Sequence, residues 1–301
     1  LDVASPTRMS SDGEYLAVTS TSTHTVSLFN IDRLSSDATG TKVGGHGIFN
    51  LPEGTNISNN MLFVADTGNN KVAIWTDIDD ALAGKSYNTL IGAENREIPE
   101  IGKDSLFWPG TVFYDDDYLW VGTANGINRG TVNEDCIDWY HQTTANGLSG
   151  DWVIGIENQL TDDLDRIWAI TWSAGEGQYN SISYTDNQGM SWQDVEYFRN
   201  QNIKIYNLDF DDEKVYAASE KGLYFSEDYI HWEKIGTSWI DSGTGDIVLD
   251  ETVYSVLLLG SSVPYGEEPE EWYDSPLINY LFIGTGDGLV FKLPGSNDHA
   301  S

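Results

Sequence analysis

Three observations predict an all-β chain that folds as a β-propeller of six blades. A short strand motif, in which an aliphatic residue accompanies an aromatic one, recurs along the 301 residues. No stretch between the copies shows the 3.6-residue periodicity of an amphipathic helix. Three or four short antiparallel strands in each repeat of roughly 48 residues is the spacing of a propeller blade. A ring of seven blades is the main alternative.

Each copy of the motif follows a polar turn rich in Asp or Asn. Five copies are well marked and EYLAVTS (14–20) is a weaker first copy; the five are MLFVADT (61–67), YLWVGTA (118–124), RIWAITW (166–172), KVYAASE (214–220) and YLFIGTG (280–286). The equivalent positions are taken as Leu16, Phe63, Trp120, Trp168, Tyr216 and Phe282, which gives spacings of 47, 57, 48, 48 and 66 residues. Because most spacings lie near one period, we expect a single propeller domain over residues 1–301.

Two segments depart from the repeat. The last spacing is 18 residues longer than 48, which we attribute to an insertion at 261–276 that is rich in Glu and Pro. The other excursion occupies 77–106, where DIDDALAG (77–84) predicts a short helix. We expect function in these non-repeating segments, because long loops at a propeller face are common binding elements.

Glycine marks the next turn of the repeat. Gly126, Gly222 and Gly288 each lie six residues after the equivalent position, and Asn69 holds that place in the second copy. Glycine, and to a lesser degree Asn, tolerates positive φ, so these residues are predicted to close hairpins.

The chain ends suggest how the ring closes. The last copy stops after about three strands, whereas LDVAS (1–5) precedes the first copy without a partner strand. We therefore expect the N-terminal strand to complete the final blade, since closure removes exposed sheet edges.

The composition excludes several functions. The chain has 48 Asp and Glu against 15 Lys and Arg, a net charge of -33, which repels nucleic acid. Cys136 is the single cysteine, so neither an intrachain disulfide nor a cysteine-based zinc site can form. No apolar run is long enough for a membrane span. The chain begins at Leu1 without a signal-like segment, which fits a processed product.

Several segments resemble known propeller repeats. VADTGNNKVAIW (64–75) resembles the NHL repeat of bacterial and archaeal propellers, and 143–171 is similar to the sensor propellers in the periplasmic part of two-component regulators. YTDNQGMSW (184–192) and FSEDYIHW (225–232) resemble the Asp-box of sialidase-like and sortilin-like propellers, although Asp186 lies six and Asp228 four residues before the Trp instead of five. The resemblances imply a propeller but differ in the function they imply.

Acidic turns are the candidate metal sites. Asp115 and Asp117 lie in one cluster and Asp209 and Asp211 in another, and alternate carboxylates offer the oxygen ligands that Ca²⁺ prefers. Each cluster also sits where other copies carry ordinary turn formers, and solvated turns are the favoured interpretation. Calcium is the one cofactor considered.

Other residues are candidates for ligand binding. His46 lies within GGHG (44–47), where glycine neighbours allow a ligand to approach closely. Tyr265, Trp272 and Tyr273 accompany carboxylates in the second insertion, a combination suited to a cationic or sugar partner. The partner is expected to be a protein or a carbohydrate at a propeller face.

The leading hypothesis is a secreted or cell-surface binding or assembly module, because no catalytic motif occurs. One alternative is an extracellular hydrolase or lyase whose site lies at the mouth of the central channel. The other is a periplasmic ligand-sensing domain. Convergent His, Arg and carboxylate side chains at the channel mouth would favour the enzyme.

Overall fold

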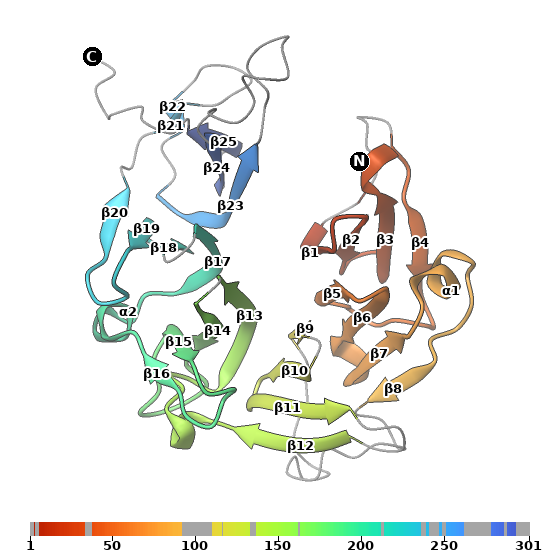
Figure 1. Cartoon of the computed structure of the whole chain (residues 1–301), viewed down its shortest axis with the longest axis horizontal. Coiled ribbons are helices and arrows are strands. Elements are labelled where there is room, and N and C mark those ends of the chain that lie inside the picture. The colour runs from red at the N-terminus through yellow and green to blue at the C-terminus, as the bar shows by residue number, and fades with distance from the viewer. Residues whose placement is uncertain are drawn as a thin grey trace. The chain divides into compact units, whose positions relative to one another are not determined.

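In the structure, a computed structural model, β-strands make up most of the regular secondary structure (Figure 1). It describes residues 3, 6–33, 38–91, 110–115, 117–132, 137–161, 163–211, 214–235, 239–240, 247–248, 251–261, 278–285 and 288–292. The chain divides into two compact units: residues 1–158, 166–179 and 183–194 form unit 1, and residues 159–165, 180–182 and 195–301 form unit 2. Each unit is considered by itself.

Unit 1 is built from antiparallel four-stranded sheets in which each strand pairs with the next along the chain. The first sheet comprises β1 (Pro6–Ser11), β2 (Tyr15–Ser20), β3 (Thr25–Asn30) and β4 (Thr41–Gly44); the second comprises β5 (Gly54–Ser58), β6 (Met61–Asp66), β7 (Lys71–Trp75) and β8 (Thr89–Ile91). The third comprises β9 (Thr111–Tyr114), β10 (Tyr118–Thr123), β11 (Gly126–Val132) and β12 (Ile137–Gln142). The fourth, most of which belongs to this unit, comprises β13 (Trp152–Leu160), β14 (Asp165–Trp172), β15 (Ser181–Thr185) and β16 (Gln193–Asp194).

Unit 2 holds one further four-stranded sheet and two smaller ones. The four strands are β17 (Ile205–Asp211), β18 (Lys214–Ser219), β19 (Gly222–Ser226) and β20 (Glu233–Ile235). The smaller sheets are β21 (Trp239–Ile240) with β22 (Ile247–Val248), and β23 (Val253–Ser261) with β24 (Ile278–Thr285) and β25 (Gly288–Lys292).

Helices are short and lie between strands. The predicted helix within 77–84 is present as α1 (Ile78–Leu82), and Asp77 caps it by accepting the Asp79 N–H at 3.0 Å. The remaining helices are α2 (Glu196–Gln201) and the 3₁₀ turns η1 (Ile31–Arg33), η2 (Thr67–Asn69) and η3 (Thr144–Asn146). None of the helices in the described parts of the chain is long and apolar enough to cross a membrane.

The predicted number of blades was wrong. The described residues form five complete four-stranded blades, not six or seven. The sixth copy of the sequence motif is real as a strand, β24, but its sheet has three strands in the described part of the chain. Each copy of the sequence motif marks only the second strand of a sheet, whereas a complete blade requires four strands. The expected ring closure by residues 1–5 falls largely outside the described residues, and β1 begins the first sheet instead.

The strand register shows which residues are equivalent in the different blades. In three blades, the last residue of the second strand pairs with the first residue of the third strand. These pairs are Ser20↔Thr25, Thr123↔Gly126 and Ser219↔Gly222. Counting back three residues from each second-strand end makes Ala17, not Leu16, the equivalent of Trp120 and Tyr216.

The hairpin glycines behave as predicted at two positions. Gly126 has φ of 96° and Gly222 has φ of 118°. In the second blade the left-handed residue is Asn70, with φ of 59°, whereas Asn69 lies inside η2. The prediction for Asn69 was therefore one residue early, because the 3₁₀ turn adds a residue before the chain reverses.

Side chains of the first strands bond the backbone of the next blade. In unit 1 the Ser10 hydroxyl oxygen accepts the Ile57 N–H at 3.0 Å, and the Asn56 carbonyl oxygen accepts the Tyr114 N–H at 3.2 Å. The Asn56 amide also donates to Ser10 at 3.3 Å. These bonds satisfy edge-strand N–H groups that no strand pairs.

The same device recurs in unit 2. Asp209 accepts the Leu258 N–H at 2.6 Å, and Asn207 accepts the Val256 N–H at 2.8 Å. The register places Asp209 opposite Tyr216, as Asn56 is opposite Phe63. A polar residue at this position therefore links one first strand to the next in both units.

The hydrophobic core lies between successive sheets. One cluster joins the first two sheets through residues such as Leu28, Val64 and Trp75, and another places Trp120 against Val153 and Trp192. The Trp120 and Trp192 rings meet edge to face, with centroids 6.2 Å apart. The aromatic residues of the sequence motif thus hold neighbouring blades together.

We expect Asn56→Ala to lower the free energy of unfolding by about 1–3 kcal/mol, the cost of removing a buried hydrogen-bond partner. Urea denaturation of the mutant and wild-type chains measures this. Lys42→Ala, an exposed change in β4, serves as the control. An Asn56→Ala chain as stable as this control would contradict the role given to the first-strand side chains.

Substitution of two glycines with similar φ can distinguish the stability cost of backbone strain from the cost of a steric clash. Gly13 (φ 93°) has no atom within 4 Å of a built Cβ, whereas a Cβ on Gly126 (φ 96°) would collide with the Gln142 carbonyl. We expect Gly13→Ala to cost roughly 1–2 kcal/mol from strain alone. Gly126→Ala should cost more, measured by the same denaturation; equal losses would contradict the clash.

Candidate functional site

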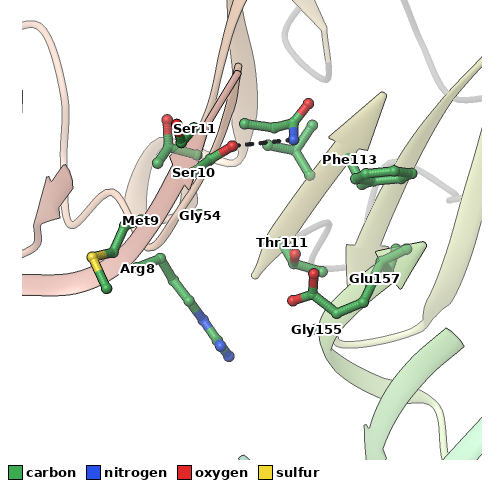
Figure 2. Close-up of a pocket in the computed structure, with 13 residues that line it drawn as sticks. Arg8, Met9, Ser10, Ser11, Gly54, Thr111, Phe113, Gly155 and Glu157 are labelled. Carbon is green, nitrogen blue, oxygen red and sulfur yellow. Dashed lines mark hydrogen bonds between the residues drawn. The ribbon is translucent and has the colours of Figure 1, made fainter. Parts of the chain in front are cut away.

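A cavity of about 280 Å³ opens where first strands of unit 1 meet (Figure 2). Strands β1, β5, β9 and β13 of four sheets line it. Its polar lining residues are Arg8, Ser10, Ser11, Thr55, Asn56, Thr111 and Glu157, and Phe113 adds an aromatic face. Several polar groups converge on this space, which makes it the candidate binding site.

Glycines let the strands come close enough to form this lining. A Cβ on Gly54 would lie 2.9 Å from the Thr111 Cα, and one on Gly155 would lie 2.7 Å from the Ile170 Cδ1. The Gly54 contact is with backbone, so a larger residue would push β5 away from β9, whereas at Gly155 the tip of the Ile170 side chain on β14 could shift instead. The cavity therefore depends on backbone packing as well as on its side chains.

Arg8 is the central cation of the cavity. In Figure 2 its side chain projects from β1 into the open space, with Thr111 and Glu157 on strands across from it. Its guanidinium donates from Nη2 to the Ile154 carbonyl oxygen of β13 at 2.8 Å. Because its side chain reaches a residue 146 positions away in the sequence, Arg8 ties the first blade to the fourth.

Charges around Arg8 oppose one another. Burial lowers the pKa of Arg8, and the carboxylates of Glu157 and Glu53 act in the opposite direction. Loss of hydration raises the pKa of Glu53, while Arg8 lowers it. Glu53 still exposes much of its surface, so water screens this pairing. The cavity thus combines the Arg8 guanidinium with the Glu157 carboxylate, and Glu53 adds a second negative charge nearby.

The sequence analysis did not identify Arg8 or Glu157. Arg8 is one of six arginines in an acidic chain and lies just before the weak first copy of the repeat. One sequence feature could have pointed to Arg8: it is a cation on the first strand of a blade, and Thr7, Ser10 and Ser11 beside it are small and polar. Which first-strand residues meet is set by the tertiary structure, which the repeat alone does not give.

The Asp115 cluster forms a turn. The Asp115 carboxylate accepts the N–H groups of Asp117 and Tyr118 at 3.1 and 2.6 Å, and it accepts the Trp120 indole N–H at 2.6 Å. Such bonds are those of an Asx turn that also fixes a core aromatic residue. They supply a structural role for Asp115 without calcium.

Asp209 and Asp211 also lie at a strand end. Asp209 accepts the Phe210 and Leu258 N–H groups at 2.8 and 2.6 Å, and burial raises its pKa. Asp211 is the last residue of β17. In the described ranges, no group of three or more His, Cys, Asp or Glu side chains is placed to hold a metal ion. The calcium sites remain a prediction.

His46 lies in a glycine turn beside a second histidine. The His24 and His46 ring centroids are 4.1 Å apart, and His24 Nδ1 accepts the Leu51 N–H at 3.0 Å. Gly44, Gly45 and Gly47 all have positive φ, as expected of a tight loop. Ligand binding by His46 stays a prediction. Tyr265, Trp272 and Tyr273 lie outside the described residues.

The first turn that resembles an Asp-box uses Asn187 where the Asp was expected. Asn187 accepts the Ser191 N–H at 3.0 Å and is five residues before Trp192. Asp186 instead forms a bidentate ion pair with Arg166 at 2.5 and 2.9 Å. The bonds are those of a stabilising turn, and membership of an Asp-box family stays a prediction.

The second such turn uses its Asp as expected. Asp228 accepts the Ile230 and His231 N–H groups at 2.9 and 2.7 Å, and Trp232 is buried. In the segment that resembles an NHL repeat, the fully buried Asp66 accepts the Asn50 N–H at 2.7 Å and the Asn69 amide at 2.8 Å. The Asp residues of these two motifs, Asp228 and Asp66, thus stabilise turns.

We expect the melting temperature to be the same with EDTA and with added Ca²⁺, because the Asp115 and Asp209 carboxylates already accept backbone N–H groups. A ligand that binds the folded state raises its stability. A rise in melting temperature with Ca²⁺ that Asp115→Asn or Asp209→Asn removes would contradict this and support calcium binding. Mg²⁺ at equal concentration controls for ionic strength.

Comparisons with known proteins show the fold. No protein-family model matches the chain, and no curated protein matches it. Among solved structures, the chain is similar to the extracellular domain of the putative one-component system BT4673 of B. thetaiotaomicron, with 14% identity, TM-score 0.54, and coverage of 93% of this chain and 31% of that chain. The extracellular domain of the putative hybrid two-component system BT3049 of B. thetaiotaomicron gives 14% identity, TM-score 0.57, and coverage of 96% and 34%.

A third similar structure is AztD of Citrobacter koseri, with 10% identity, TM-score 0.51, and coverage of 97% of this chain and 69% of that chain. The chain spans about a third of the length of the two B. thetaiotaomicron domains. At identities of 10–14% these similarities bear on the fold alone. The chain has a β-propeller fold.

Proposed function

We propose that this propeller works outside the cytoplasm and binds a small polar ligand in the cavity around Arg8. The observation that carries the proposal is the convergence of Arg8, Glu157 and several hydroxyl and amide groups on one space of about 280 Å³. A ligand with both a hydrogen-bond acceptor and a donor could contact the Arg8 guanidinium and the Glu157 carboxylate from this space.

The similar structures agree with this proposal. Two of them are extracellular domains of putative one-component and two-component systems, and a domain that senses a ligand needs a binding site. The net charge of -33 disfavours nucleic acid and a strongly anionic ligand. A protein or carbohydrate partner at another face, as expected from the sequence, is compatible with a ligand in the cavity.

One observation favours an enzyme as the second candidate. Glu157 lines the cavity together with Arg8, and a carboxyl group beside a bound ligand is a type of side chain that acts as a general acid or base. The lining residues of this cavity include no histidine. A hydrolase or lyase would require this carboxyl group to contact a reacting bond. Product analysis after incubation with the ligands that bind would detect turnover and thus favour the enzyme.

The binding proposal is tested by melting the chain with amino acids, dicarboxylates, hexoses, disaccharides and polyamines as probes. We expect at least one probe to raise the melting temperature, by an amount equivalent to about 2.7 kcal/mol at a hundredfold excess over its Kd. Arg8→Ala and Glu157→Gln should each weaken that probe's binding roughly tenfold or more, because hydrogen bonds to charged groups contribute about 1.5–3 kcal/mol.

Lys42→Ala in β4 of the first sheet is the matched control and should bind as the wild type does. The proposal fails if no probe shifts the melting temperature. It also fails if Arg8→Ala binds the probe as tightly as the wild type, since the ligand then lies elsewhere.

A further inference from the structure

Two tryptophans form an exposed corner at one end of the fourth sheet. Trp152 is the first residue of β13 and Trp172 is the last residue of β14, the neighbouring antiparallel strand. Their ring centroids are 5.7 Å apart and their planes meet at 73°. Trp152 is 42% exposed, although large aromatic side chains are usually well covered.

The backbone of Tyr179 lies beside the same strand ends. Its N–H donates to the Ser149 carbonyl at 2.8 Å, and the residue is 44% exposed. A Cβ on Gly150 would lie 2.9 Å from the Tyr179 carbonyl oxygen and would collide with the Trp172 carbonyl oxygen. Only glycine fits there, so the backbone before Trp152 packs directly on the backbone of Trp172 and Tyr179. We call Trp152, Trp172 and Tyr179 the aromatic corner.

A polar network holds the loops around the aromatic corner. Asp151 donates its N–H to Gln178 Oε1 at 3.0 Å, and the Gln178 amide donates to the Asp151 carboxylate at 2.6 Å. Gln178 Oε1 also accepts the Ala174 N–H at 2.9 Å, and Asp151 accepts the Thr144 N–H at 2.8 Å. These bonds fix both chain segments that carry the aromatic residues. The backbone that carries the rings is therefore ordered before any ligand arrives.

The charges around the aromatic corner have one sign. The segments 143–152 and 172–180 contain Asp151 and Glu176 and neither Lys nor Arg. The whole chain also carries a net charge of -33, which includes these two carboxylates. Two aromatic rings meet near right angles, and the segments that carry them contain carboxylates but no Lys or Arg, a composition that favours a positive charge because ring faces attract cations.

We propose that the aromatic corner binds an organic cation with an apolar shell, of the trimethylammonium class. The site differs from the cavity around Arg8, because none of the three aromatic residues lines that cavity. It also differs in chemistry, since the cavity has its own guanidinium and the aromatic corner has none. The proposal therefore stands whether or not the cavity binds its ligand.

The test is calorimetric titration of the whole chain with choline as the probe. The neutral isostere 3,3-dimethylbutan-1-ol has the same shape without the charge and separates attraction to a cation from burial of apolar surface. We expect choline to bind saturably and the alcohol to bind several-fold more weakly. Trp152→Leu keeps an apolar side chain but removes the ring, and should weaken choline binding about tenfold.

Two further variants complete the design. Trp152→Tyr retains an aromatic face and should recover most of the affinity, and Ile48→Ala, another exposed apolar residue, should bind choline as the wild type does. Thermal melting confirms that each variant is folded. The proposal is overturned if choline does not bind the wild type, if the alcohol binds equally well, or if Trp152→Leu leaves affinity unchanged. Binding of cellobiose instead of choline at the aromatic corner would also overturn it.

Discussion

Unpaired backbone on the first strand of each sheet is the constraint on which the rest of this structure depends. A first strand is an edge strand, and its outward N–H groups have no strand to accept them. Ser10, Asn56 and Asp209 supply the missing acceptors to the next first strand. Polar residues at these positions therefore hold sheets together, and in unit 1 the bonds from Ser10 and Asn56 fix β1, β5 and β9, three of the strands that line the cavity.

Much of the blade could be predicted because its determinants are local. The second-strand copies, the positive φ of Gly126 and Gly222, and the helix α1 follow from residues within a few positions of one another. The number of complete blades could not be predicted in this way. A sixth second strand exists as β24, yet a blade also needs a fourth strand whose sequence carries no mark of the repeat.

The candidate site was harder to predict for a related reason. The turn aspartates are conspicuous in the sequence because acidic residues recur there, and Asp115 shows that such a residue can be fully used by its own turn and by Trp120. Arg8 is inconspicuous, and its partner Ile154 lies 146 residues away. Long-range contacts of this kind arise only when sheets pack. A site formed by residues of several blades therefore cannot be predicted from the sequence of one repeat.

Strand β13 begins with Trp152 and continues through Gly155 to Glu157, so one short segment contributes to the aromatic corner and to the cavity. A strand is a stiff connection, with successive residues only about 3.3 Å apart. If both sites bind ligands, a shift of β13 favoured by one ligand would change the affinity for the other, and thermodynamic linkage would make the effect equal in both directions. Strand β13 is thus the one element that the two proposed sites share.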